Sequence, residues 1–283
     1  MVTKRRDVNG TGVTTTTHEI EWRGRGRRFH VVRPVAASSK VALPVVVVLH
    51  GGFGTGSGQI THGRWLPAAV RHGFVLLAPD GFRRTWNAGT CCGPARRHGI
   101  DDVGFLDVAV DVTADITVID RTRVFASGMS NGGMMAYRWA CESRHAVRAI
   151  APVAATMCAP PGVAPGRPVS LLHIHGTHDH NVPLEGGRGS RAVDRSGPRP
   201  PVRTGVELFA RNNGCDPDPV VDEQGPVTPT RGRHGRDGTE VELVVVAGGG
   251  HAWPGGERMH RRLDPPSHAL DATERIAGFF LRP

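Results

Sequence analysis

The chain has 283 residues, 39% of them hydrophobic, with 38 glycines and 22 prolines, so it is long enough for a full core and must contain many loops. Its net charge of +9 comes almost entirely from scattered arginines without interleaved aromatic residues, which argues against nucleic-acid binding. No run of about eighteen apolar residues is present and no apolar segment follows the basic start, so we expect no membrane span, no signal peptide and a cytoplasmic location for the chain as written.

The N-terminal part divides into a polar tail and the start of a domain. Residues 1–16 are rich in threonine and lack periodicity, which predicts a disordered tail. Residues 17–283 are expected to form one domain, because the chain is short for two. Within it, residues 18–22 and 28–33 predict a two-stranded hairpin at a sheet edge.

Apolar runs then alternate with segments of helical periodicity. The run from Pro44 to Leu49 is continuous, which is typical of a parallel strand covered on both faces. Further strands are expected at 74–80, 124–126, 147–154, 169–175 and 241–246, and helices near 61–72, 101–116, 133–140, 204–212 and 270–281. This alternation predicts an α/β fold with a mostly parallel sheet and helices on both faces. In such sheets the functional loops follow the carboxyl ends of the strands.

The stretch Gly128–Gly132 fits the G-x-S-x-G pattern between a predicted strand and a predicted helix. In that pattern a strained turn holds a serine clear of the backbone, and glycines are needed because a side chain would collide with neighbouring backbone. The N-terminus of the following helix favours negative charge at the nucleophile. We therefore predict that Ser130 is a nucleophile. An ordinary strand–turn–helix connection is the competing interpretation.

Two later loops supply the partners that a serine nucleophile needs. Asp179 follows the predicted strand 169–175, and His251 follows the strand 241–246. A serine hydroxyl requires an imidazole to take its proton, and the imidazole requires a carboxylate to fix its tautomer. The order serine, aspartate, histidine is that of the α/β-hydrolases, so we assign His251 as general base and Asp179 as its orienting carboxylate.

The glycine-rich stretch His50–Gly54 directly follows a central predicted strand. The N–H groups of Gly52 and Asn131 are predicted to form an oxyanion hole for the acyl-transfer intermediate. A nucleotide-binding loop is the alternative, but the sequence contains no G-x-x-x-x-G-K-[ST] and no matching acidic residue after the next strand.

These motifs together resemble the α/β-hydrolase family of polyhydroxybutyrate-depolymerase-like esterases, which includes feruloyl and acetyl-xylan esterases. The matching segments are Leu49–Gly52, Ala78–Gly81, Cys91–Gly93, Asp101–Leu106, Gly128–Gly133, His175–Pro183, Gly249–Gly255 and Asp271–Glu274. The resemblance implies a serine carboxylic-ester hydrolase that cleaves hydroxyalkanoate, hydroxycinnamoyl or acetyl esters. Its members are usually secreted, whereas the start of this sequence leads us to expect no leader.

Three groups of residues invite other interpretations. Histidines and Asp179 crowd into residues 173–180, which suggests a metal site, but a metal would make Asp179 unavailable, so no metal is expected. Of the five cysteines, Cys91 or Cys92 is predicted to pair with Cys158. Trp253 and Trp86 are candidate substrate-binding residues, with core packing as the alternative for Trp86.

The sequence thus predicts a single-domain serine esterase that needs no cofactor. The loop between the strands at 147–154 and 169–175 is too short for a cap domain, which predicts an open cleft for a bulky or polymeric ester. Its partner is expected to be that ester rather than a nucleic acid or a membrane, and the oligomeric state is left open. An acyltransferase or thioesterase with the same triad is the main alternative, and a non-catalytic binding module is the other.

Overall fold

The computed structural model describes most of the chain. The described residues are 5–9, 12–38, 40–192, 197–215, 220–221, 225–232, 234–258 and 263–282, with backbone only for 5–9 and 220–221. No helix among these residues is long and apolar enough to cross a membrane.

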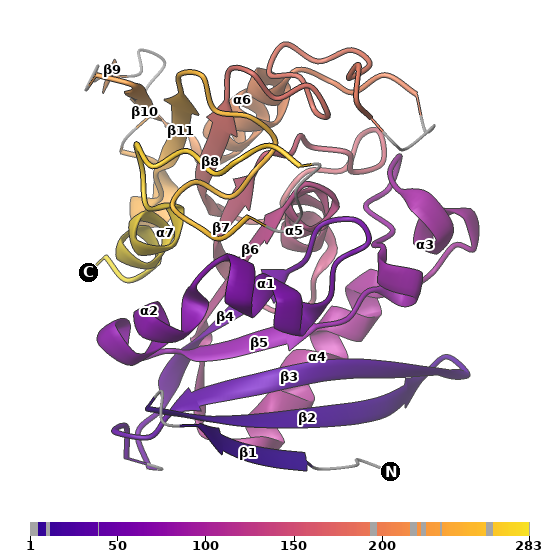
Figure 1. The fold of residues 1–283 in the computed structure, drawn as a ribbon, viewed down its shortest axis with the longest axis vertical. Helices are drawn as coiled ribbons and strands as arrows, with labels where there is room; N and C mark the ends of the chain where they lie inside the picture. The colour runs from indigo at the N-terminus through magenta and orange to yellow at the C-terminus, as the bar shows by residue number, and fades with distance from the viewer. Residues whose placement is uncertain are drawn as a thin grey trace.

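A single sheet forms the centre of the molecule (Figure 1). In the described part of the chain its strands are β1 (Arg5–Asn9), β2 (Val13–Trp22), β3 (Arg25–Pro34), β4 (Leu43–Leu49), β5 (Val75–Pro79), β6 (Ile119–Met129), β7 (Val147–Val153), β8 (Ser170–Gly176), β9 (Val220–Val221), β10 (Val227–Gly232) and β11 (Val241–Val246). Their order across the sheet is β1-β2-β3-β5-β4-β6-β7-β8-β11-β10-β9. The six strands from β5 to β11 in that order run parallel, and the flanking strands are antiparallel.

Helices cover both faces of this sheet. They are α1 (Gly56–His62), α2 (Trp65–His72), α3 (Gly93–Arg97), α4 (Asp102–Ile116), α5 (Asn131–Glu142), α6 (Val202–Asn213) and α7 (Ala272–Phe280). Helices α4, α5 and α6 pack on one face, and α1, α2 and α7 pack on the other. Strand β4 shows why: Val45 and Val47 face the first layer while Val46 and Val48 face the second, so a continuous apolar run is buried on both sides.

The predicted α/β architecture is therefore confirmed, with two differences at the edges. The tail predicted for residues 1–16 is wrong where it is described, because residues 5–9 form β1 and residues 13–16 begin β2. The consecutive threonines that suggested disorder lie in β2 and are β-branched, and such residues suit a strand. At the opposite edge, β9 and β10 were not expected, since their short segments lack a long apolar run.

The strand order places a switch point in the middle of the sheet. From β4 the chain passes through α1 and α2 to β5 on one side, and then through α4 to β6 on the other side. The carboxyl ends of strands at such a point are where α/β sheets bind ligands. Residues 154–169, which join β7 to β8, contain no helix, so no cap domain is inserted there.

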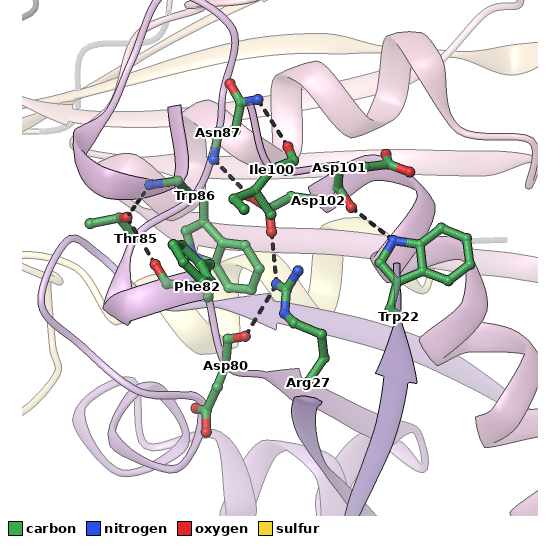
Figure 2. A network of polar contacts seen from close by, with 12 residues as sticks. Trp22, Arg27, Asp80, Phe82, Thr85, Trp86, Asn87, Ile100, Asp101 and Asp102 are labelled. Atoms are coloured by element: carbon green, nitrogen blue, oxygen red, sulfur yellow. Dashed lines mark hydrogen bonds and ion pairs between the residues drawn. The ribbon is translucent and has the colours of Figure 1, made fainter. Parts of the chain in front are cut away.

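A buried ion pair fastens the long loop after β5 to the hairpin (Figure 2). Arg27 on β3 donates to Asp102 Oδ1 at 2.7 Å, and both side chains are buried. The other oxygen of Asp102 accepts the Asn87 N–H at 2.7 Å, so the carboxylate joins the hairpin to the loop that carries Trp86. Burial raises the pKa of Asp102 above its usual value, although Arg27 acts to lower it.

This geometry predicts that Arg27→Met destabilises the fold by about 3 to 5 kcal/mol, because it leaves a buried carboxylate without its cation. Urea unfolding of both proteins measures the difference. The neighbouring pair of Arg23 and Asp101 is the control, since its side chains are 70% and 31% exposed. Arg23→Ala should cost no more than about 1 kcal/mol. Equal losses for the two variants would contradict the assignment.

Candidate active site

Ser130 lies on a sharp turn between β6 and α5, as the sequence predicts. Its φ of 52° and ψ of −121° are unusual for a residue with a side chain. The turn is held by backbone hydrogen bonds, from Ser130 N–H to the Val153 carbonyl and from Met134 N–H to the Ser130 carbonyl, both 2.9 Å long. The surrounding backbone therefore fixes the position of this half-buried serine.

The two glycines of the motif are required by close backbone contacts. A Cβ on Gly128 would lie 2.6 Å from the Gly132 carbonyl carbon, and a Cβ on Gly132 would lie 2.6 Å from the His50 carbonyl oxygen. No side chain fits at such distances. The turn thus packs directly against the end of β4, where the loop Gly51–Gly54 begins.

Asp179 and His251 meet above the neighbouring strands. His251 Nδ1 lies 2.8 Å from Asp179 Oδ2, and Asp179 Oδ1 accepts the N–H groups of Asn181 and Val182 at 2.9 and 2.8 Å. Burial acts to raise the pKa of Asp179, but the hydrogen bond from His251 and its charge outweigh this effect, so the pKa lies below its usual value. A carboxylate in this position holds the proton of the imidazole on Nδ1.

The structure does not join this pair to Ser130 by a hydrogen bond. Among the described residues, His251 Nε2 has no hydrogen-bond partner and none links the Ser130 hydroxyl to the ring. Catalytic hydrogen bonds are often long or misaligned when no substrate is present, so the geometry leaves Nε2 available as a base.

A buried chain of hydrogen bonds supports the Asp179 loop from below. Tyr137 on α5 contacts His173 Nδ1 at 2.7 Å, His173 Nε2 contacts His175 Nδ1 at 3.2 Å, and His175 Nε2 contacts the Val182 carbonyl at 2.8 Å. Because the carbonyl can only accept, His175 must donate to it, and each neutral imidazole then donates in the same direction. Burial lowers the pKa of both histidines, which keeps them neutral.

The predicted oxyanion donors are the backbone N–H groups of Asn131, which directly follows Ser130, and of Gly52, in the loop after β4. In the described part of the chain, neither the Gly52 N–H nor the Asn131 N–H has a hydrogen-bond acceptor. A Cβ placed on Gly51 would lie 3.6 Å from Ser130 Cβ, so this loop lies against the serine. Backbone donors without an acceptor are what an oxyanion hole requires.

Trp86 has a structural position that the sequence did not reveal. Its indole N–H donates to the His50 carbonyl at 2.9 Å. Its backbone N–H donates to the Asn131 side-chain oxygen at 2.7 Å, and the Asn131 side-chain amide donates to its backbone carbonyl at 3.0 Å. The residue is fully buried, so it fastens the His50 and Asn131 loops together.

The predicted role of Trp86 and Trp253 in substrate binding disagrees with these positions. Trp253 is also buried, packs against Trp65, and donates its indole N–H to Thr273 at 2.9 Å. An indole held in the core presents no surface to a substrate. Tryptophans next to active-site motifs can serve packing equally well, and sequence alone does not separate the two roles.

The predicted cysteine pairing needs revision, and the structure shows where the clustered histidines lie. Cys91 is joined to its neighbour Cys92, so the predicted pairing of either with Cys158 is wrong, although the Thr90 N–H does reach the Cys158 carbonyl at 2.8 Å. Among the described residues no group of three or more histidine, cysteine, aspartate or glutamate side chains could hold a metal. The histidines at 173 and 175 are buried in the hydrogen-bond chain, while those at 178 and 180 are exposed.

Asp264 is a site residue that no sequence motif indicates. Its Oδ2 accepts the backbone N–H of His251 at 2.8 Å, and its Oδ1 pairs with Arg191 at 2.8 Å. It therefore fixes the backbone of the predicted base. Since it lies in a loop with no motif, only its spacing of thirteen residues from His251 connects the two in the sequence.

The fold and this arrangement together define an α/β-hydrolase, with a serine on an elbow, a histidine–aspartate pair and two free backbone donors at one edge of the sheet. No protein-family model matches the chain. It is 30% identical over 263 residues to "Putative esterase NocK" of Nocardia uniformis subsp. tsuyamanensis, covering 88% of this chain and 76% of that protein. It is 26% identical to "Feruloyl esterase B" of Piromyces equi and 30% identical to "Feruloyl esterase D" of Neurospora crassa, of which it spans 42% and 61%.

Solved structures show the same fold at low sequence identity. The acetyl xylan esterase from Aspergillus awamori is 15% identical with a TM-score of 0.58, and the match covers 89% of this chain and 94% of that one. An S-formylglutathione hydrolase from Agrobacterium tumefaciens is 14% identical with a TM-score of 0.52, over 88% and 91% of the two chains. The chain belongs to the α/β-hydrolase family of esterases related to feruloyl and acetyl-xylan esterases, and it is a carboxylic ester hydrolase.

The buried histidines predict how stability depends on pH. Burial lowers the pKa of His50 to about 4, and it also lowers the pKa of His173 and His175, so below about pH 6.5 these three side chains bind more protons in the unfolded chain than in the folded one. The free energy of unfolding should therefore fall as the pH drops from 6.5 to 5, more steeply than the about 1.4 kcal/mol per pH unit of a single proton.

Urea unfolding at several pH values measures this slope. Substitution of an exposed histidine, His178→Gln or His180→Gln, provides the control and should leave the slope unchanged. A free energy of unfolding that is flat between pH 6.5 and 5 would show that these histidines are not held neutral.

Proposed function

We propose that Ser130, His251 and Asp179 form the catalytic triad of this esterase, with the N–H groups of Gly52 and Asn131 as its oxyanion hole. The observation that carries the proposal is the 2.8 Å contact between His251 Nδ1 and Asp179 Oδ2 at the sheet edge where Ser130 occupies a strained elbow. An imidazole bonded in this way through Nδ1 offers Nε2 to the serine proton.

In the proposed reaction Ser130 Oγ attacks the ester carbonyl while His251 Nε2 takes its proton. The negative oxygen of the tetrahedral intermediate lies between the Gly52 and Asn131 N–H groups. Collapse of the intermediate expels the alcohol, which receives the proton from His251, and leaves an acyl group on Ser130. Water, deprotonated by His251, then attacks the acyl-enzyme; the bond between the acyl group and Ser130 Oγ breaks, His251 returns the proton to Ser130, and the carboxylic acid is released.

We further propose that the substrate is a bulky or polymeric ester of the feruloyl-esterase or polyhydroxyalkanoate-depolymerase type. Two observations support this. The connection of β7 to β8 contains no helix that would cover Ser130, and relatives are named feruloyl esterases and an acetylxylan esterase/xylanase. The long loop after β5, which carries Trp86, is held in place by hydrogen bonds to Asn131 and Asp102.

Ser130→Ala should lower turnover by at least about four orders of magnitude, because it removes the nucleophile. The assay compares wild type and variant on phenyl acetate, methyl ferulate and a hydroxybutyrate oligomer, and the best ester identifies the substrate type. Ser127→Ala is the control: this buried serine of β6 donates to the Ala151 carbonyl and should affect stability but not turnover. Full activity of the Ser130 variant, or no turnover of all three esters by folded wild type, would contradict the proposal.

Asp179→Asn should lower kcat by about four orders of magnitude while the protein stays folded. Asn keeps an oxygen for the Asn181 and Val182 N–H groups but places an amide opposite His251 Nδ1. That amide favours the tautomer with the proton on Nε2, which cannot act as a base. Kinetics with phenyl acetate and a circular dichroism spectrum test this, and loss of activity only through unfolding would argue against the tautomer role.

A further inference from the structure

Phe53 is an aromatic residue exposed to solvent at the edge of the candidate site. Its side chain is 62% exposed, whereas every other phenylalanine, tyrosine and tryptophan among the described residues is buried or half-buried. The other exposed large apolar residues in the described part of the chain are valines. At this exposure the ring gains little free energy from burial, so core packing does not account for it.

The backbone at Phe53 is also unfavourable for a phenylalanine. Its φ is 65°, in the left-handed region where a bulky residue is a true outlier. The conformation is enforced, because the Phe53 N–H donates to the Arg84 carbonyl at 2.8 Å and the Gly54 N–H donates to the Gly51 carbonyl at 3.0 Å. Glycine would adopt this conformation without strain, so neither packing nor backbone geometry accounts for the aromatic side chain.

The same short turn carries the proposed oxyanion donor. Gly52 immediately precedes Phe53, and Gly51 lies against Ser130 Cβ. The partner loop is strained as well, since Arg83 and Arg84 have φ values of 46° and 61°, and Arg84 Nε donates to the Gly54 carbonyl at 3.2 Å. Strained residues held rigidly by their surroundings concentrate at sites that contact a ligand.

We propose that Phe53 binds the substrate by stacking against an aromatic ring carried by the ester. This rests on the proposed function, because the ring must belong to an ester bound at Ser130. An isolated exposed ring has little area with which to hold a flexible aliphatic chain. A planar ring on the substrate can stack flat against the Phe53 ring and so makes the largest contact with it. Little conformational entropy is lost in ordering Phe53, since its side chain has only two rotatable bonds.

Phe53→Ala tests the proposal through the ratio of kcat/KM for an aromatic ester to that for methyl butyrate. Phenyl acetate carries the ring on the alcohol and methyl cinnamate carries it on the acyl group, so the two arms show which side Phe53 contacts. The ratio should fall about tenfold in at least one arm, as expected for one lost aromatic contact, and Phe53→Leu should restore only part of it. Val118→Ala, an exposed apolar residue beside the opposite end of β6, is the control and should leave both ratios unchanged.

Stability separates a binding role from a structural one. Phe53→Gly should not lower the melting temperature, because it removes an exposed side chain and relieves a left-handed residue. A clear loss of stability would overturn the inference in favour of a structural role. If wild type is active and Phe53→Ala leaves both aromatic ratios unchanged, this inference alone is overturned. If folded wild type hydrolyses none of phenyl acetate, methyl cinnamate and methyl butyrate, the proposed function is overturned with it.

Discussion

The strained turn at Ser130 is the constraint around which the rest of the site is built. A residue with a side chain in this backbone region costs about 1 to 3 kcal/mol and persists only where its surroundings enforce it. Here the enforcement comes from the sheet: the Val153 carbonyl of β7 accepts the Ser130 N–H, and Gly132 packs against the carbonyl of His50 after β4. Because β4, β6 and β7 are neighbouring buried strands, the position of the serine is determined by the core itself.

Helix α5 then links this turn to the two other parts of the site. At its first residue, the Asn131 side chain holds both backbone groups of Trp86, which in turn holds the carbonyl of His50. Two turns further on, Tyr137 begins the hydrogen-bond chain that reaches the Val182 carbonyl, and the Val182 N–H binds Asp179. One helix therefore positions both the proposed oxyanion loop and the Asp179 loop relative to the same serine. Every residue of these hydrogen-bond connections is buried and has a partner. A buried network of this kind is stable only when complete, which gives a unique geometry to the loops it joins.

The sequence was sufficient for the parts of this arrangement that depend on local pattern. Continuous apolar runs predicted the central strands, and the glycines around Ser130 predicted the elbow, because each follows from short-range sterics and burial. The network at Asn131 and Trp86 could not be predicted, since it depends on which side chains meet across loops more than forty residues apart. The same limit explains the wrong roles for the tryptophans and the wrong cysteine pairing. The exposure of Phe53 was equally hidden, because this residue lies in a short turn after β4, where no periodic pattern distinguishes core from surface.

The most direct test of the central claim is the mass of the protein after reaction with an aryl phosphonate ester, followed by identification of the labelled peptide. A phosphonate captures only a nucleophile that has both an activating base and donors for the developing oxyanion, so it reports on the whole constellation at once. The proposed triad predicts one adduct per chain, located on Ser130. A folded protein that remains unlabelled, or an adduct on another residue, would contradict it.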